Sequence, residues 1–408
     1  MKRRQFLIRT GLLSLMGGLI PSRFLAASAG PTPAPPAATH PPLGSFHARL
    51  KVKPVINAVG SVTYLGGSIM APETLAAMDD ASREFVVITE LLEQAGEHLA
   101  QLLGVEAALV TTGAAGAITL GTAACITGGE IEKIQRLPDT TGLKNEVILQ
   151  KSHRNEYETQ LRLVGTQLIE VETRVQLEAA INDRTAMLFF MNNADPFGQI
   201  RRDEWVELGR KHGIPTFLDA AADTPPREHL SSYARMGFDL VAFSGGKSLR
   251  GPQSTGLLVG RKDLIDAARH NASPYDRTIG RAMKVGKEEI AGLVTAVERF
   301  LTTDHEAEYR QLESRIRRIG EALAGLAAVH TELWVPEIAN HVPHLMVTWD
   351  PARLPLSTAT VYQRLLDGDP RVAVRERAPH SVIVSALMLR PEEDAIVASR
   401  LRAVLGGA

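Results

Sequence analysis

DLVAFSGGKSLRGPQSTGLLVG, residues Asp239–Gly260, consists of two apolar runs on either side of a glycine-rich turn. The runs Asp239–Ser244 and Gly256–Gly260 have the length and composition of short buried β-strands. The two glycines that end the first run allow a tight, unusual backbone turn. Lys247 follows them directly, so the sequence predicts a lysine held at the edge of a sheet; a solvated surface lysine is the alternative.

Further strand patterns alternate with helical ones upstream of this segment. The predicted strands are Ala107–Gly113, Glu146–His153, Gln167–Val171, Ala186–Met191 and Ile214–Ala222. Leucines at helical spacing up to Leu103, and the segment Arg202–His212, predict helices that end at the following glycines. This alternation predicts a doubly wound, mostly parallel α/β sheet, in which ligands bind at the carboxyl ends of the strands.

The pattern changes beyond Lys287, where helices dominate. The long charged segment from His305 to about Leu326 is expected to bridge two domains, and short strands alternate with helices from Thr331 onward. This second part predicts a small C-terminal α+β domain. We divide the chain into a signal peptide at 1–29, a proline-rich linker at 30–45, an N-terminal arm at 46–72, a large domain at 73–300, and a bridging helix with the small domain at 301–408.

The first thirty residues have the three parts of an export signal. A basic start with the pair Arg3 and Arg4 precedes an apolar run at Leu12–Ile20, and a small-residue cleavage site ends at Ala29. The paired arginines followed by Gln-Phe-Leu resemble a twin-arginine signal. We expect the twin-arginine export machinery as a partner and a periplasmic or otherwise exported location after cleavage near Ala29. The alternative is an amphipathic start or an uncleaved anchor.

The composition is that of an ordinary soluble globular protein, with 44% hydrophobic and 22% charged residues among 408. A formal net charge of -1 gives no electrostatic case for binding nucleic acid. The one cysteine, Cys125, excludes an intrachain disulfide and is expected to be a buried small apolar residue. No zinc-type cluster of cysteines and histidines is found, so no metal site is expected.

Four residues able to take part in chemistry come at predicted strand ends: Gly113, His153, Asp219 and Lys247. A lysine in this position suggests a Schiff base with pyridoxal phosphate, whose ring nitrogen needs a carboxylate partner. Asp219 meets this need, because it ends an apolar strand 28 residues before Lys247 and leaves room for one helix and one strand between them. An ordinary helix cap is the alternative role for Asp219.

The phosphate and the ring of this cofactor need further contacts. Gly113, Ala114 and Ala115 begin a helix directly after a strand, so their backbone N–H groups and the helix dipole favour a phosphate there. Ser244, three residues before the lysine, could add a hydroxyl. His153 is the candidate for an imidazole over the pyridine face; a hydrogen-bonded loop histidine is the alternative.

The segment FSGGKSLRGPQSTGLLVG resembles the lysine signature of the fold-type-I pyridoxal-phosphate enzymes, in the group of bacterial selenocysteine synthase and D-glucosaminate-6-phosphate ammonia-lyase. VINAVGSVTYLGG at 55–67, TTGAAGAI at 111–118, QKSHRNEY at 150–157 and IGRAMKVGKEEI at 279–290 are also similar to segments of this group. The resemblance covers about 50–405. It implies a seven-stranded sheet, a small C-terminal domain, and a homodimer or larger homo-oligomer with active sites at subunit interfaces.

The resemblance also implies roles for single residues. Lys247 would be the Schiff-base lysine and later the proton shuttle at the substrate α-carbon, Asp219 the pyridinium partner, and His153 the stacking residue. Gly113 to Ala115 with Ser244 would hold the phosphate. Selenium transferases of this group act on a charged tRNA and have an N-terminal domain that reads it, whereas this chain has a signal and a linker there; we therefore expect a small-molecule substrate and no nucleic acid.

Four arginines are candidates for binding an anionic group of the substrate. They are Arg250, Arg281, Arg375 and Arg390, and the last two could hold an α-carboxylate in a bidentate pair. Any of them could instead be a surface or ion-paired arginine. The expected function is an exported pyridoxal-phosphate enzyme that acts on an amino acid or amino sugar acid by α,β-elimination or β-replacement through the Schiff base on Lys247. An aminotransferase, a racemase, or a non-catalytic binding protein of the same fold are the alternatives.

Overall fold

The structure, a computed structural model, describes residues 46–406. The predicted signal peptide and the proline-rich linker lie outside the described residues. The chain separates into one unit that ends at Lys53 and a second unit that runs from Pro54 to Ala408. The described part of the first unit contains one short helix, α1 (Phe46–Arg49). All features discussed below belong to the second unit.

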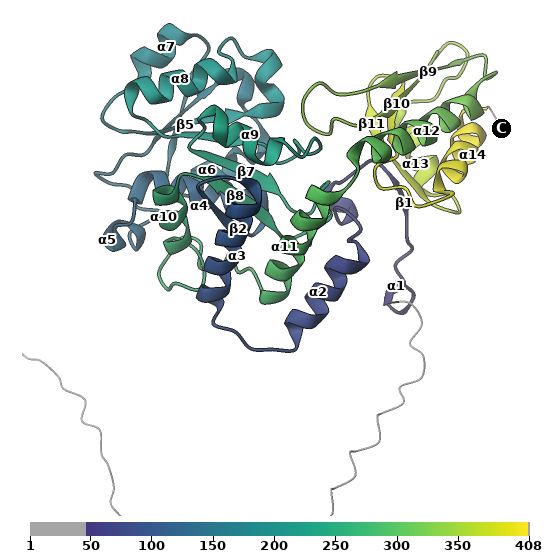
Figure 1. Ribbon diagram of the computed structural model, residues 1–408. Coiled ribbons are helices and arrows are strands. Elements are labelled where there is room, and N and C mark those ends of the chain that lie inside the picture. Colours follow the sequence, from purple (N-terminus) through teal and green to yellow (C-terminus); the bar gives the residue numbers. More distant parts are fainter. Residues whose placement is uncertain (1–45, 407–408) are drawn as a thin grey trace, which may run out of the picture. The chain divides into compact units, whose positions relative to one another are not determined.

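A seven-stranded sheet forms the larger part of the second unit (Figure 1). Its strands are β2 (Ala107–Thr111), β3 (Glu146–Gln150), β4 (Gln167–Val171), β5 (Thr185–Met191), β6 (Thr216–Asp219), β7 (Leu240–Ser244) and β8 (Gly256–Gly260), in the spatial order β2-β8-β7-β6-β5-β3-β4. Strands β3 to β7 pair in parallel, and β8 is antiparallel to both β2 and β7. The predicted α/β class and the seven strands are confirmed.

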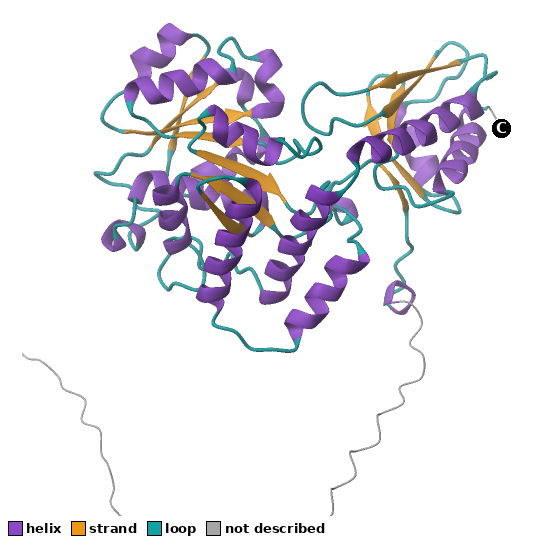
Figure 2. Cartoon of the chain, in the orientation of Figure 1, coloured by secondary structure: helices purple, strands orange, loops and turns teal. Residues whose placement is uncertain are grey.

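Helices cover both faces of this sheet (Figure 2). They are α2 (Pro72–Ser82), α3 (Ile88–Leu103), α4 (Gly113–Thr127), α5 (Ile131–Ile134), α6 (Thr159–Arg162), α7 (Arg174–Ala180), α8 (Arg202–His212), α9 (His229–Met236), α10 (Lys262–His270) and α11 (Lys287–Thr302). Consecutive strand residues point to opposite faces. Phe217 of β6 packs against Gly121 of α4, whereas its neighbour Thr216 packs against Gly209 of α8. The central strands are therefore buried on both sides.

A five-stranded sheet forms the smaller part. The order of its strands is β1 (Ile56–Ala58), β11 (Val372–Arg377), β12 (Ser381–Ser385), β10 (His344–Trp349) and β9 (Val329–Trp334). This smaller part also contains the helices α12 (His305–Leu323), α13 (Thr358–Leu366) and α14 (Glu393–Leu405). Its own apolar core includes Ile56 and Ala58 of β1 together with residues beyond Leu312. Because β1 pairs in parallel with β11, part of the predicted arm belongs to the small domain.

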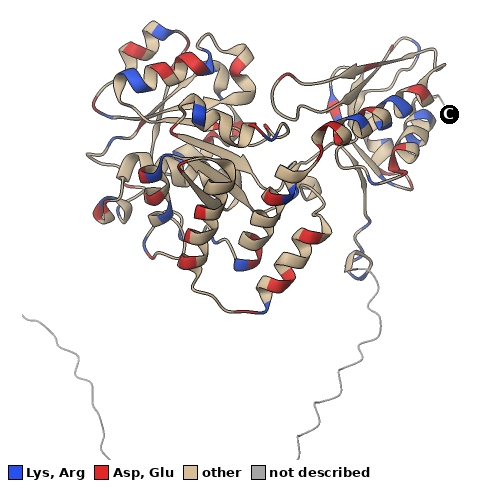
Figure 3. Cartoon of the chain, in the orientation of Figure 1, with Lys and Arg blue, Asp and Glu red and all other residues tan. Residues whose placement is uncertain are grey.

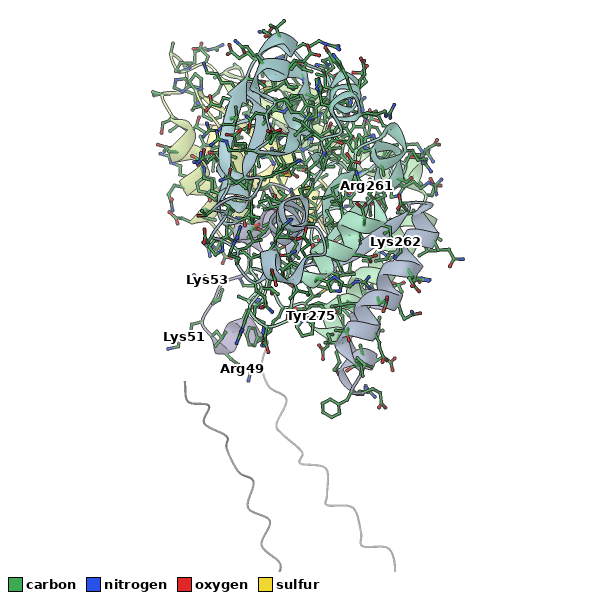
Figure 4. The ribbon with its side chains drawn as sticks, turned by 90° about the vertical axis from the view of Figure 1, so that its left-hand side faces the viewer. Arg49, Lys51, Lys53, Arg261, Lys262 and Tyr275 are labelled. Carbon is green, nitrogen blue, oxygen red and sulfur yellow. The ribbon has the colours of Figure 1, made fainter. Side chains whose placement is uncertain are left out.

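The strand registers bring the ends of four strands together at one edge of the large sheet. Asp219 is opposite Ala242, and Ser244 is opposite Gly256, which is in turn opposite Thr111 of β2. The other end of β8 leads to Arg261 and Lys262 at the start of α10, labelled in Figure 4. Asp219, Ser244 and Thr111 therefore share the edge from which the Lys247 turn projects. Within the described residues, no helix is long and apolar enough to span a membrane.

Candidate active site

Lys247 lies in a hydrogen-bonded turn that follows β7. The Gly245 N–H donates to the Thr255 carbonyl (2.8 Å), and the Gly251 N–H donates to the Gly245 carbonyl (2.9 Å). Beneath this turn lies the Gln253 side chain, whose Oε1 would be 2.7 Å from a Cβ at Gly246. The turn therefore needs glycine at position 246, and it holds Lys247 half-buried instead of free in solvent.

The N-terminal segment fixes this turn from a second side. A Cβ at Gly67 would overlap the same Gln253 side chain and would be 2.7 Å from the Gly246 carbonyl oxygen. Gly67 has a φ of 75°, in the left-handed region that favours glycine. The short helix η1 (Thr63–Leu65), just before it, brings Tyr64 close enough to Arg375 of β11 for their charges to interact. The segment after β1 thus contributes to the site.

Two buried carboxyl groups lie close enough to Lys247 for their charges to raise its pKa. Asp219, 5% exposed, accepts a hydrogen bond from the Ala221 N–H (3.0 Å), and Asp223, 3% exposed, ends the tight turn that follows β6. Burial raises the pKa of Asp219, although the Ala221 N–H and the charge of Lys247 oppose this shift. Burial also raises the pKa of Asp223 to about 6, and the negative charge of Asp219 adds to the rise.

The charged groups around the lysine nitrogen shift the pKa of Lys247 in opposite directions. Burial lowers the pKa of Lys247, because an ammonium group loses hydration there. The carboxylates of Asp219 and Asp223 act against this shift, whereas the guanidinium of Arg375 adds to it. The structure thus brings the predicted residues Lys247, Asp219 and Arg375 together, along with Asp223, which was not predicted. Figure 3 marks the positions of lysine and arginine in blue and of aspartate and glutamate in red along the ribbon.

The N-terminus of α4 is suited to hold a phosphate. Gly113, with φ 69°, begins this helix, and the space where its Cβ would stand is open. Thr112 provides no side-chain cap, so N–H groups of the first turn, including those of Ala114 and Ala115, have no intrahelical partner. A Cβ at Gly256 would collide with Gly113, so a glycine in β8 lets the helix terminus approach the sheet edge near Ser244.

His153 is not available to a cofactor, contrary to the prediction. Its side chain is fully buried in the large domain. Its ring packs edge-to-face against Phe190 (4.4 Å between centroids) and lies more nearly parallel to the Trp205 ring (6.5 Å between centroids). Its Nδ1 accepts from the Met191 N–H (3.2 Å), and its Nε2 lies 3.1 Å from the Gln150 amide nitrogen. A ring enclosed in this way has no free face for stacking, so the alternative of a hydrogen-bonded histidine holds.

Three of the four candidate arginines have structural partners. Arg250 pairs with Glu308 of α12 (3.0 Å) and is close to the Leu387 carbonyl, so it ties the lysine turn to the small domain. Arg281 pairs with Asp276 (3.2 Å), and Arg390 is exposed and pairs with Glu393 (3.2 Å). Because these guanidinium groups are engaged, the predicted substrate role is not supported for Arg250 or Arg390, and no described contact brings Arg281 to Lys247.

Arg375 differs from these three. It is half-buried, and no ion pair is found for it among the described residues, yet its charge acts on Lys247 and on His344. His344 of β10 lies on the same sheet and has its pKa lowered to about 4 by burial. Arg375 is therefore the candidate arginine that can offer its guanidinium to a ligand beside the lysine.

A sequence signal for Asp223 does exist. Asp219 and Asp223 are four residues apart in LDAAADTPP, directly after a predicted strand, so both could have been placed at the same edge of the sheet. No group of three or more histidine, cysteine or acidic side chains suited to a metal ion occurs in the described part of the chain.

Comparisons with known proteins identify the family. Residues 55–319 match the model of the L-seryl-tRNA selenium transferase family. The chain is 30% identical over 373 residues to D-glucosaminate-6-phosphate ammonia lyase of Salmonella typhimurium, covering 88% of this chain and 98% of that protein. It is 33% identical over 377 residues to 5'-C-glycyluridine monooxygenase-decarboxylase of a Streptomyces species, covering 88% and 92%. The chain belongs to the L-seryl-tRNA selenium transferase family.

Solved structures agree with this family membership. The structure of D-glucosaminate-6-phosphate ammonia-lyase matches with a TM-score of 0.76 and 30% identity, covering 89% of this chain and 98% of that one. Serine palmitoyltransferase of Sphingomonas wittichii matches with a TM-score of 0.57 at 14% identity, which shows the fold alone. The chain has the fold of the fold-type-I pyridoxal-phosphate enzymes and is an enzyme of this group, in which lyases and transferases occur.

The residues of the site fit pyridoxal phosphate, the cofactor of this group. Lys247 has the half-buried amine that the cofactor aldehyde needs, and Asp219 supplies a buried carboxylate for the ring nitrogen. The open N-terminus of α4, with Gly113, Ala114 and Ala115, and the nearby Ser244 supply donors for the phosphate. His153 does not supply a ring that could stack on the pyridine ring of the cofactor.

The core position of His153 has a consequence for stability below neutral pH. Burial lowers the pKa of His153 to about 4, whereas an unfolded histidine titrates near about 6.5. Between these values the unfolded chain binds a proton that the folded chain does not, so the free energy of unfolding falls as the pH falls. The contribution of one such histidine is at most about 1.4 kcal/mol per pH unit.

We predict that His153→Gln makes the fall in unfolding free energy between pH 6.5 and 4 less steep and leaves the affinity for pyridoxal phosphate within about twofold. Urea unfolding followed by circular dichroism at several pH values gives the slope, and cofactor titration gives the affinity. An unchanged slope combined with a large loss of affinity would contradict the core position.

Proposed function

We propose that the chain is an exported pyridoxal-phosphate enzyme that carries out α,β-elimination or β-replacement on an amino acid or amino sugar acid. The observation that carries this proposal is the position of Lys247, half-buried and faced by the carboxyl groups of Asp219 and Asp223 and by the guanidinium of Arg375. A protein that only binds a ligand has no need for a lysine whose pKa is lowered beside a carboxylate suited to a pyridine nitrogen.

The residues of the chain have separate tasks in this chemistry. Pyridoxal phosphate, when bound, supplies an electron-withdrawing ring that stabilises negative charge on the substrate α-carbon. Lys247 would hold the cofactor through its amine, and once free, this amine would remove the proton from the substrate α-carbon. The lowered pKa of Lys247 increases the neutral, basic fraction of this amine near neutral pH. Asp219, which accepts a hydrogen bond from the Ala221 N–H, would pair with the ring nitrogen and keep it protonated.

The substrate class follows from Arg375 and from the names of the relatives. Three relatives are named for substrates that contain an amino-acid group: glucosaminate, glycyluridine and seryl-tRNA. An α-carboxylate would pair with the guanidinium of Arg375 on one side of the site, while the α-carbon faces Lys247 on the other. A small amino-acid-type molecule fits this arrangement, and a formal net charge of -1 gives no electrostatic case for tRNA.

The reaction is tested by a screen of amino acids and amino sugar acids for release of ammonia and a keto acid. We predict that the mature protein with pyridoxal phosphate releases both from at least one substrate, and that Lys247→Ala lowers kcat at least about a thousandfold, because general base catalysis is lost. Parallel assays in air and under argon detect an oxygen-dependent reaction, the type named for the relative that is 33% identical. Exclusive transamination, racemisation or oxygen-dependent decarboxylation would contradict the proposal.

The role of Arg375 is tested with a matched arginine of the same domain. We predict that Arg375→Ala raises KM for the amino-acid substrate about tenfold to a hundredfold, because a charge-assisted pair to the carboxylate is lost. The exposed Arg353, which donates to the Ala327 carbonyl (2.7 Å), is the control, and Arg353→Ala leaves KM unchanged. Equal effects of the two substitutions would exclude a substrate role for Arg375.

We further propose that the mature chain is exported and forms a homo-oligomer. Export is supported by the arginine pair and apolar run at the N-terminus, and by a cofactor that the protein must bind before it leaves the cytosol. Detection of the chain in the cytosolic fraction alone would contradict export.

Assembly is supported by an exposed apolar segment, residues 64–87, in which Tyr64, Ile69, Phe85 and Val87 are 67%, 58%, 101% and 57% exposed.

A second copy of the chain would cover this apolar segment close to Arg375, with which Tyr64 interacts. We predict that Phe85→Glu weakens self-association at least about tenfold, since it places a charge in the buried centre of an interface. Val175 of α7, 75% exposed and outside this segment, is the control, and Val175→Glu leaves the assembly unchanged. Sedimentation velocity measures both variants; a monomeric wild-type protein would refute the proposed assembly.

A further inference from the structure

The site contains one more buried carboxyl group than the ring nitrogen of the cofactor requires. Asp219 is sufficient for that nitrogen, yet Asp223 also lies at the end of β6 with 3% of its surface exposed. The Asp223 N–H donates to the Ala220 carbonyl (3.1 Å), and the Ser244 N–H lies 3.4 Å from the Ala221 carbonyl. The turn between the two aspartates therefore folds over the end of β7, from which the Lys247 turn starts.

The Asp223 carboxylate is fixed by side chains from two other elements. Asn192, fully buried at the start of helix η4 (Asn192–Phe197), donates through Nδ2 to Asp223 Oδ2 and also to the Tyr233 hydroxyl (3.0 Å). Tyr233 of α9 is itself 3% exposed and hydrogen-bonded to Asp223. His229 of α9 holds the Asp223 carbonyl oxygen at 2.7 Å from its Nδ1.

The contacts continue away from the site and balance the buried charge. Arg202 donates through Nη1 to Asn192 Oδ1 (3.1 Å), and its guanidinium lies 5.9 Å from the centre of the Tyr233 ring. Asp195, with no exposed surface, has its carboxylate 3.4 Å from Arg202 Nε and 3.2 Å from Arg201 Nη2. Four elements therefore define where the Asp223 carboxylate stands. Such a set of buried polar groups is costly unless it is fully paired.

The charged groups that act on the pKa of Lys247 come from three parts of the fold. Asp219 ends β6, Asp223 ends the turn after it, and Arg375 belongs to β11 of the small domain. Asp219 is also to pair with the ring nitrogen, which leaves Asp223 as the carboxylate that can serve the lysine alone. Without it, the lysine nitrogen would face Arg375 and a carboxylate already engaged with the cofactor.

We propose that Asp223 is a positioning residue for Lys247, whose carboxylate holds the lysine nitrogen in place and stabilises its protonated form between proton transfers. The proposal rests on the role of Lys247 in the proposed function. Asn192 and Tyr233 serve to hold this carboxylate toward the lysine instead of toward solvent. The pair would let Lys247 take the proton from the α-carbon and hold it until it is delivered to the departing β-group, so the same nitrogen accepts and then releases this proton.

The first test uses the protein without its cofactor. The acylation rate of Lys247 by a small anhydride, followed by peptide mass, is measured against pH and reports the fraction of neutral amine. Removal of the negative charge in Asp223→Asn makes the ammonium easier to deprotonate, and we expect the midpoint to fall by about one pH unit, that is, about a tenfold faster reaction below the midpoint. An unchanged or raised midpoint would overturn the proposal.

Three further variants keep this test decisive. Asp223→Glu, which keeps the charge, is expected to retain most of the wild-type midpoint. Asn192→Ala removes one donor that favours the charged form of Asp223, so it is expected to lower the midpoint by a smaller amount, and it serves if Asp223→Asn does not fold. Asp394→Asn is the control, because Asp394 is also buried and paired with Arg318 (2.7 Å) but lies in α14; it is expected to change nothing.

The second test uses the enzyme with pyridoxal phosphate bound. The pH at which its visible absorption changes reports protonation of the nitrogen bound to the cofactor, and Asp223→Asn is expected to lower this pH as well. If the wild-type chain does not bind the cofactor at Lys247, the proposed function fails, while the acylation midpoints still decide the role of Asp223. If the cofactor binds and both midpoints are equal to those of the wild type, only the role of Asp223 fails.

Discussion

The attraction between Lys247 and the two carboxyl groups at the end of β6 is the interaction on which the site depends. Burial disfavours a charged lysine, a charged Asp219 and a charged Asp223 alike; Lys247 favours the charged form of each carboxyl group, and both carboxylates favour the ammonium form of Lys247, whereas Asp219 opposes a charge on Asp223. The seven-stranded sheet brings them together, because β6 and β7 are parallel neighbours and their carboxyl ends share one edge. The small domain adds Arg375 to this balance, and the Arg250–Glu308 pair joins that domain to the lysine turn.

Much of this arrangement could be predicted from the sequence, and the exceptions have physical reasons. Lys247, Asp219 and Gly113 were predicted because each directly follows an apolar run, and the carboxyl ends of parallel strands meet at one edge. The direction of a side chain is not contained in such a pattern. The short helix η2 (Lys151–His153) after β3 turns the His153 ring into the core, against Phe190. Likewise, the pairing of β1 with β11 joins residues more than 300 positions apart, for which the sequence holds no local signal.

The arginines show the same limit. Arg250 was one of four candidates and lies only three positions beyond Lys247, but its guanidinium pairs with Glu308 on α12. Arg375 is 128 positions away and yet acts on the lysine. Relatives that are 30% and 33% identical are named for ammonia removal and for oxidative decarboxylation. Relatives of similar identity to this chain are thus named for different reactions.

The most direct test of the central claim is to locate the cofactor on the chain. Purified mature protein with pyridoxal phosphate is reduced with borohydride, digested, and examined by mass spectrometry. The account predicts a stable cofactor adduct on the peptide that contains Lys247, and a strong reduction in the amount of this adduct in Asp219→Asn, which lacks the carboxylate for the ring nitrogen. Modification of a different lysine, or equal labelling of many surface lysines without preference for Lys247, would contradict it.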